Sequence, residues 1–276
     1  MKKLIIFITL FVFVFNIKTA TSQNEKLWEF NIWPKKISDM DFYDDNSLCY
    51  TYDRATGGEP SGFIIRNLLD TVVTRDIPLS FKPIGFRISR EKNMIVFCTL
   101  DKIYISDLNV ENMDSMEVDE FKLEYVHESE DNIQFFDVNF EENKIAIMQY
   151  LKNDGDSVLK GGQQYFSRLL IYDITTKQIV KRLGDIKSTY YLLKYSPDGK
   201  YLAVVNNHLF DHSHFVRLIN TENYEEVDKI EGKDISIEGL SFSPNSKNLV
   251  ITLNNPGEQL IFYSLEDFII TSRKYN

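Results

Sequence analysis

Cysteine is scarce in this sequence, which contains two cysteines among 276 residues. So few cysteines exclude a disulfide-stapled scaffold, because such small folds depend on several bridges. Cys49 and Cys98 both lie in apolar, strand-like segments. The sequence leaves two alternatives open: one bridge formed in an oxidising compartment, or two buried free thiols.

Long hydrophobic runs are also missing after the first 15 residues. The run from Leu4 to Phe15 follows two lysines, and it is shorter than the ~20 residues of a membrane span. With small Ala20 and Ser22 after it, this start is typical of a secretory signal peptide. We therefore predict a signal peptide over 1–22 and a single mature domain over 23–276, secreted or periplasmic, with no stable membrane span. An uncleaved N-terminal anchor is the alternative.

Positive charge is in deficit, with 31 basic against 41 acidic residues and a net charge of −10. An acidic chain binds nucleic acid poorly, because phosphates are met by Lys and Arg. The sequence also lacks a Gly-x-Ser-x-Gly elbow, a phosphate-binding glycine loop, a dinucleotide fingerprint and paired-cysteine metal motifs. We expect no cofactor and no nucleic-acid partner.

An internal repeat is the main positive feature. Residues 193–205 and 240–251 each contain an apolar stretch, a Ser-Pro turn and a second apolar stretch. Proline presets the first turn position, and flanking β-branched residues are typical of a hairpin. Weaker copies begin near Met40, Phe86 and Val138. The aligned apolar anchors are Phe42, Ile88, Phe140, Tyr195 and Phe242, spaced by 46, 52, 55 and 47 residues.

A third and usually a fourth strand follow each hairpin in the predicted pattern. Four short antiparallel strands at this period predict an all-β fold, a β-propeller with four-stranded blades and about five recognisable repeats. Six or seven blades stay open, and Lys26 to Ile32 is a further strand candidate. An open β-sandwich is the alternative, but it does not explain five aligned hairpins.

The segment from Tyr195 to Ala203, Tyr-Ser-Pro-Asp-Gly-Lys-Tyr-Leu-Ala, resembles the hairpin of the bacterial WD40-like β-propeller repeats. The resemblance covers most of the mature chain and is specific in the last two repeats. The Trp-Asp dipeptide of eukaryotic WD40 blades is missing. The family resemblance implies a propeller fold and a role in binding other molecules, without a single activity.

The loops between the second and third strands of each repeat are unequal in length, and long loops on one face of a scaffold often carry its function. The third-repeat loop, Leu151 to Ser167, is rich in acids, amides and aromatics that suit a protein or glycan partner. Tyr165 and Phe166 have a second interpretation as the start of the third strand. The predicted binding residues are Asp154, Asp156, Gln163, Gln164, Tyr165, His208, Asp211 and His212.

Two further sites are weaker candidates. His208, His212 and His214 gather in the fourth-repeat loop, where imidazoles could bind a metal, although their spacing matches no strong signature. Asp39 and Asp137 are placed at the same first-strand position of two repeats, where paired carboxylates facing a central channel could hydrolyse a glycosidic bond. The leading hypothesis is an exported binding module for a protein or a glycan; the alternative is an exported glycoside hydrolase or lyase.

Overall fold

The computed structural model describes residues 35–54, 61–69, 72–99, 102–117, 136–152, 165–183, 188–208, 214–232, 236–254 and 258–275. Every regular element in these ranges is a β-strand, which confirms the predicted all-β class. Within the same ranges, no helix has the length and apolar character needed to cross a membrane. The predicted signal peptide and the Lys26–Ile32 strand candidate lie outside the described residues.

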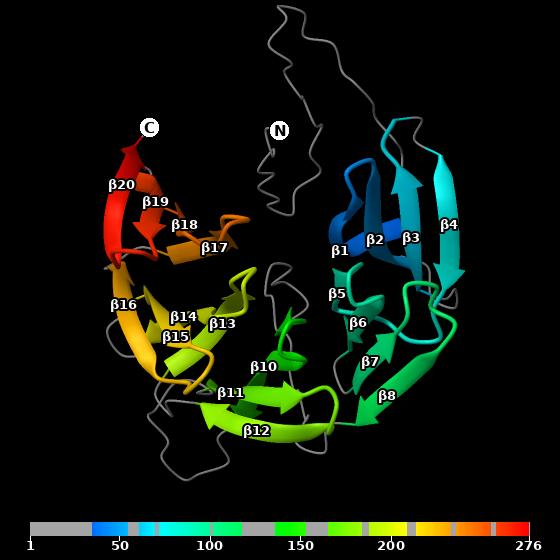
Figure 1. Cartoon of the computed structure of the whole chain (residues 1–276), viewed down its shortest axis with the longest axis horizontal. Coiled ribbons are helices and arrows are strands. Elements are labelled where there is room, and N and C mark those ends of the chain that lie inside the picture. The colour runs from blue at the N-terminus through cyan, green and yellow to red at the C-terminus, as the bar shows by residue number, and fades with distance from the viewer. Residues whose placement is uncertain are drawn as a thin grey trace, which may run out of the picture. The chain divides into compact units, whose positions relative to one another are not determined.

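The strands form five antiparallel sheets of four, each in chain order (Figure 1). The first sheet contains β1 (Lys35–Asp44), β2 (Ser47–Arg54), β3 (Gly62–Asn67) and β4 (Val73–Pro78). The second contains β5 (Gly85–Ser89), β6 (Met94–Cys98), β7 (Lys102–Ser106) and β8 (Met113–Glu117). The third contains β9 (Phe136–Asn139), β10 (Lys144–Lys152), β11 (Tyr165–Asp173) and β12 (Gln178–Leu183).

The fourth sheet contains β13 (Ser188–Tyr195), β14 (Tyr201–His208), β15 (His214–Asn220) and β16 (Glu226–Gly232). The fifth contains β17 (Ser236–Phe242), β18 (Asn248–Asn254), β19 (Glu258–Ser264) and β20 (Ile269–Tyr275). These sheets are the blades of a five-bladed β-propeller, so the predicted fold class is confirmed. The third strand predicted for every repeat is present, and the fourth strand, predicted for most repeats, is present in all five sheets.

The described residues group into two compact units. The first unit holds β1 to β6 and the segment Ile105–Met113. The second unit holds β9 to β20, together with Lys102–Tyr104 and Asp114–Glu117. The division therefore passes through the second sheet.

Tight turns explain why the chain reverses at regular intervals. Turns between first and second strands place one residue at positive φ in four sheets: Asn93, Asn143, Gly199 and Ser246. Turns between third and fourth strands do the same: Val110, Lys177, Tyr224 and Phe268. Asn and Gly tolerate this conformation, whereas it is strained for a β-branched residue such as Val110.

The two Ser-Pro turns share one hydrogen-bond pattern. The Ser196 hydroxyl donates to the Asp198 carboxylate at 2.7 Å and accepts the Tyr201 N–H at 3.0 Å. Ser243 donates to the Asn245 side chain at 2.7 Å and accepts the Asn248 N–H at 2.9 Å. Because one serine satisfies both ends of the turn, the repeated Ser-Pro motif closes both hairpins in the same way.

Apolar side chains pack neighbouring sheets together inside each unit. In the first unit, the Phe63 ring meets Phe86 and Phe97 edge-on, with centroids 5.2 and 5.6 Å apart. In the second unit, Leu202 and Val204 pack with residues of the third sheet, while Ala203 and Val205 pack with residues of the fifth. Each buried Phe, Leu or Val side chain of this kind contributes about 1.5–3 kcal/mol. Successive side chains of β14 point to opposite faces of the fourth sheet, so this strand packs against the third sheet on one face and the fifth sheet on the other.

The strand register corrects one part of the sequence alignment. Val138, not Phe140, pairs with the first core residue of its second strand, Ile145. Phe140 belongs to the turn between β9 and β10. A shift of two residues keeps the apolar alternation of a strand unchanged, so the pattern alone could not detect it.

This register separates the two candidate acids. Asp39 pairs with Thr51 in the first sheet, and the equivalent pair in the second sheet is Gly85 with Cys98. Asp137 pairs with Ala146, two positions nearer the turn. Its equivalents in the other first strands are Asp41, Arg87, Lys194 and Ser241. Asp39 and Asp137 therefore do not occupy the same first-strand position.

Candidate functional site

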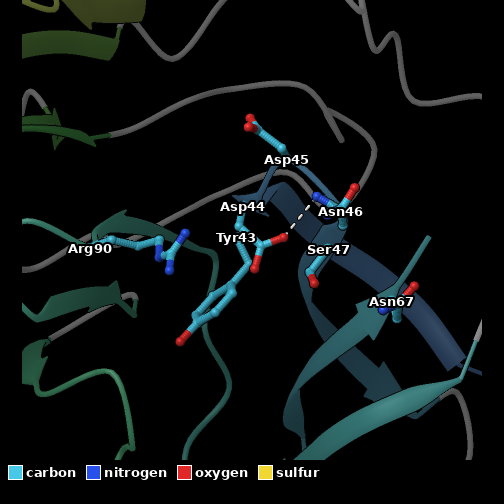
Figure 2. Close-up of a pocket in the computed structure, with 7 residues that line it drawn as sticks. All are labelled: Tyr43, Asp44, Asp45, Asn46, Ser47, Asn67 and Arg90. Carbon is cyan, nitrogen blue, oxygen red and sulfur yellow. Dashed lines mark hydrogen bonds between the residues drawn. The ribbon is translucent and has the colours of Figure 1, made fainter. Parts of the chain in front are cut away.

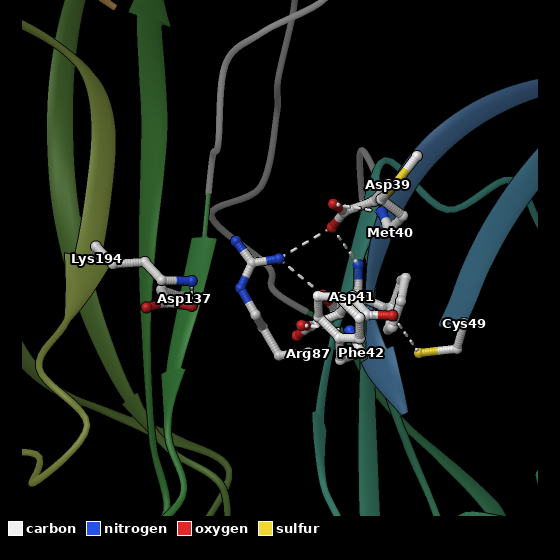
Figure 3. A network of polar contacts seen from close by, with 9 residues as sticks. Asp39, Met40, Asp41, Phe42, Cys49, Arg87, Asp137 and Lys194 are labelled. Atoms are coloured by element: carbon white, nitrogen blue, oxygen red, sulfur yellow. Dashed lines mark hydrogen bonds and ion pairs between the residues drawn. The ribbon is translucent and has the colours of Figure 1, made fainter. Parts of the chain in front are cut away.

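In the first unit, Asp39 joins β1 to the first strand of the next sheet (Figure 3). One carboxylate oxygen accepts the Phe86 N–H at 3.1 Å and the Arg87 guanidinium at 2.9 Å. The other oxygen accepts the Met40 N–H at 2.9 Å. The Arg87 guanidinium also donates to the carbonyl of Phe86 at 2.7 Å. The carboxylate thus satisfies a main-chain donor and a nearly buried cation of the adjoining sheet.

In the second unit, Asp137 makes the corresponding kind of contact. Its carboxylate accepts the Tyr195 N–H at 2.7 Å and lies 3.6 Å from the Lys194 ammonium. Asp137 is 3% exposed, so removing the carboxylate would leave a buried N–H without its acceptor. Burial, followed by the nearby Tyr224 and Asp137, raises the pKa of the Tyr195 hydroxyl well above its usual range.

Each candidate acid therefore has a structural task within its own unit. A general acid or nucleophile must reach substrate. Asp39 and Asp137 instead bind main-chain N–H groups of the following sheet. Catalysis by this pair gains no support from these contacts.

Most of the predicted binding residues belong to or border the segment that connects β10 and β11, two long strands of the third sheet. β10 and β11 are both nine residues long and pair as far as Lys152 with Tyr165. Tyr165 and Phe166 begin β11, which agrees with their interpretation as strand residues. Asp154, Asp156, Gln163 and Gln164 lie outside the described residues, so their role stays a prediction.

Two of the three candidate histidines, His208 and His214, belong to the next sheet of the same unit. β14 ends at His208 and β15 begins at His214, which pairs with Asn207. Asp211 and His212 lie outside the described residues. Within the described part of the chain, no three His, Cys, Asp or Glu side chains are grouped so as to hold a metal ion. The metal candidate His208–His212–His214 stays a prediction.

Both cysteines are free, buried thiols in the structure. The Cys49 thiol donates to the Asp41 carbonyl at 3.3 Å, and Cys98 donates to the Thr99 carbonyl at 3.4 Å. Burial, with the charges of Asp41 and Asp39, raises the pKa of the Cys49 thiol far above its usual range. Since the thiolate is the reactive form, Cys49 is unsuited to nucleophilic catalysis.

A hollow of about 530 Å³ lies at the turn end of the first sheet (Figure 2). Its lining consists of aromatic, acidic, amide, hydroxyl and guanidinium groups: Tyr43, Asp44, Asp45, Asn46, Ser47, Asn67 and Arg90. All seven residues belong to the first unit. Sequence reasoning did not identify this feature. The first turn, Asp44-Asp45-Asn46, lacks the Ser-Pro of the last two repeats, but the second and third repeats lack it too, so no sequence signal singled out this turn.

The lining groups come from three segments of the chain. The end of β1, the turn after it and the start of β2 supply Tyr43 to Ser47, the end of β3 supplies Asn67, and the turn after β5 supplies Arg90. The Arg90 guanidinium lies over the Tyr43 ring, 5.5 Å from its centroid. Asp44 accepts the Asn46 N–H at 2.8 Å, which shapes the turn. The hollow therefore offers hydrogen-bond donors and acceptors around one aromatic ring.

Comparisons with known proteins support the fold and leave the activity open. The sequence matches no protein-family model and no curated protein. The structure is similar to hydrazine synthase of Kuenenia stuttgartiensis, with a TM-score of 0.56 and 14% sequence identity. The likeness covers 84% of this chain and 65% of that one, so this chain spans less than two thirds of the matched chain. At this identity the likeness supports a propeller-type fold and nothing finer.

Proposed function

We propose that this chain is an exported β-propeller binding module of the bacterial WD40-like kind, which recognises a protein or a glycan through the long loops of the third and fourth sheets. The observation that carries the proposal is the pair of long hairpins in the second unit. β10 and β11 have nine residues each, and β14 and β15 have eight and seven. The equivalent strands of the first sheet, β2 and β3, have eight and six, and those of the second sheet, β6 and β7, have five each. Stiff ladders that extend a loop are suited to presenting a recognition surface.

The contacts of the first-strand acids weaken the glycoside hydrolase alternative. Asp39 and Asp137 each hold a main-chain N–H of the adjoining sheet. The shared bonding of the Ser196 and Ser243 turns supports the WD40-like resemblance. Export rests on the basic and apolar start of the sequence.

The test is an affinity capture from the native cell envelope with residues 23–276 as bait. Because Lys152 pairs with Tyr165, residues 153–164 can be replaced by Asn-Gly, which closes a two-residue hairpin. The expected result is a specific protein or glycan that the intact chain captures and the loop variant does not.

A matched control replaces the short connection 255–257, between β18 and β19, with Gly-Ser-Gly. This variant should retain the partner, and both variants should keep the far-ultraviolet circular dichroism of the parent. Capture that survives removal of 153–164 would reject this loop as the recognition surface. Failure of every folded form to capture anything would reject the binding proposal.

A further inference from the structure

Neighbouring turns are joined differently in the two units. In the second unit, the Asn139 amide donates to the Gly199 carbonyl at 2.9 Å. The Asp198 N–H donates to the Ser246 hydroxyl at 2.9 Å. Hydrogen bonds thus tie the turns of the third, fourth and fifth sheets together. In the first unit, the equivalent turns of the first and second sheets bound the 530 Å³ hollow instead.

Several polar groups around this hollow make no hydrogen bond within the described residues, although the Arg90 guanidinium does contact the Tyr43 ring. The Asp45 carboxylate, the Asn46 side-chain amide and the Arg90 guanidinium have no hydrogen-bond or ion-pair partner within the described ranges. Asp45, Asn46 and Arg90 are also exposed. Asp44 uses one oxygen for the Asn46 N–H and keeps the other. Hydrogen-bond acceptors and donors therefore line the same hollow and are available to a ligand.

The mixture of charges limits what the hollow can bind. The two carboxylates would repel an anion such as phosphate, whereas the Arg90 guanidinium would repel a metal ion or a basic side chain. The lining contains one aromatic residue and no aliphatic one, so a hydrophobic ligand would leave polar groups desolvated. A neutral molecule rich in hydroxyl groups can bind both the carboxylates and the guanidinium, since each hydroxyl group donates and accepts hydrogen bonds.

We propose that this hollow is a binding site for a neutral saccharide, separate from the long-loop surface. Asp44 and Asp45 would accept from sugar hydroxyls, while Arg90 and Asn46 would donate to them. The Tyr43 ring would border the apolar face of the sugar. The volume lies within the range of ~300–1,000 Å³ that small-molecule sites occupy. The site belongs wholly to the first unit, so it does not depend on the proposed loop surface.

The experiment titrates residues 23–276 with four neutral disaccharides: maltose, cellobiose, lactose and diacetylchitobiose. Saturation-transfer NMR detects binding, and calorimetry measures the affinity. At least one disaccharide should bind. Asp45→Ala and Arg90→Ala should each weaken it about tenfold, which corresponds to the ~1.4 kcal/mol expected of a hydrogen bond to a charged group.

Glu91→Ala is the matched control, because Glu91 is exposed on the same turn as Arg90 but does not line the hollow. It should bind like the parent. The variant lacking 153–164 should also bind normally, which separates this site from the loop surface. No binding of any disaccharide by the folded parent would overturn the proposal. Binding that Asp45→Ala and Arg90→Ala leave unchanged would overturn it too.

Discussion

In both units a first-strand carboxylate and apolar packing join neighbouring sheets, but only in the second unit are the turns between first and second strands also hydrogen-bonded to the adjoining sheet within the described residues. Gly199 in the second unit accepts hydrogen bonds from Asn139 and from Thr221, at 2.9 and 2.6 Å. In the first unit, Asp39 and the Phe63–Phe86 contact link the first two sheets. Between the turns of those sheets the chain leaves a hollow.

The difference follows from turn chemistry. The Ser-Pro turns at Ser196 and Ser243 have their own hydrogen bonds satisfied by one serine. They also present an acceptor to the preceding sheet, the Gly199 carbonyl in one turn and the Ser246 hydroxyl in the other. The first turn, Asp44-Asp45-Asn46, uses a carboxylate for its internal bond. Repeats of one fold can therefore share strands and still diverge at their turns, where exposed polar groups become available for binding.

The largest expected effect comes from breaking the turn contact of the second unit with Gly199→Ala. Gly199 has φ +71°, and an added Cβ would lie 2.6 Å from the Asn139 amide nitrogen. Strain and a lost hydrogen bond together should lower the free energy of unfolding by about 2–3 kcal/mol. Urea unfolding followed by circular dichroism measures this change.

Ser246→Ala is the comparison for that variant, since it removes only the acceptor of the Asp198 N–H. Ser246→Ala should lower the free energy of unfolding by about 1 kcal/mol. If Gly199→Ala were no more destabilising than Ser246→Ala, the turn would relax without strain, and the contact between turns would not explain the difference between the units.

The next effect tests whether the carboxylate contacts hold sheets together in both units. Asp39→Ala and Asp137→Ala should each destabilise the protein by about 2 kcal/mol, because each leaves an N–H of the next sheet without its acceptor. Hydrogen exchange should quicken at Phe86 in the first variant and at Tyr195 in the second. Urea unfolding and exchange mass spectrometry measure both.

Asp41→Ala provides a control that shares the register position of Asp137 but is exposed. It should change stability less than either variant. Asp137→Asn keeps an acceptor for the Tyr195 N–H and should fall between Asp137→Ala and the parent. Unchanged exchange at Tyr195 in Asp137→Ala would contradict the assigned role.

The smallest effect is the pH dependence of a contact within the third sheet of the second unit. A hydrogen bond from Lys144 and then the Thr176 N–H lower the pKa of Asp173 to about 2. The unfolded value is about 3.9, so the contact stabilises the fold above about pH 4 and is lost as the pH falls toward 2. Since the pair is partly exposed, its contribution should stay below about 1 kcal/mol.

Asp173→Asn measures this contribution as a difference in melting temperature from the parent. The difference should be constant from neutral pH to about pH 5 and should vanish near pH 2. A difference that is the same near pH 2 as at neutral pH would show that Asp173 acts through something other than its charge.

The strands were predictable because alternation and turn residues are local. The Ser-Pro turns and the succession of strands in each repeat follow from neighbouring residues. The alignment of Phe140 was wrong, because a strand pattern with period two is unchanged by a two-residue shift. The supposed equivalence of Asp39 and Asp137 was wrong for the same reason.

The sequence by itself determined the repeat, the strand content and the five hairpins, because each depends on residues close together in the chain. Tertiary structure alone decided which first-strand residues occupy equivalent register positions in different sheets. It also decided that Asp39 and Asp137 bind the next sheet and that the first turn borders a hollow. These features depend on register and on contacts between residues about 50 positions apart, which a local pattern does not encode.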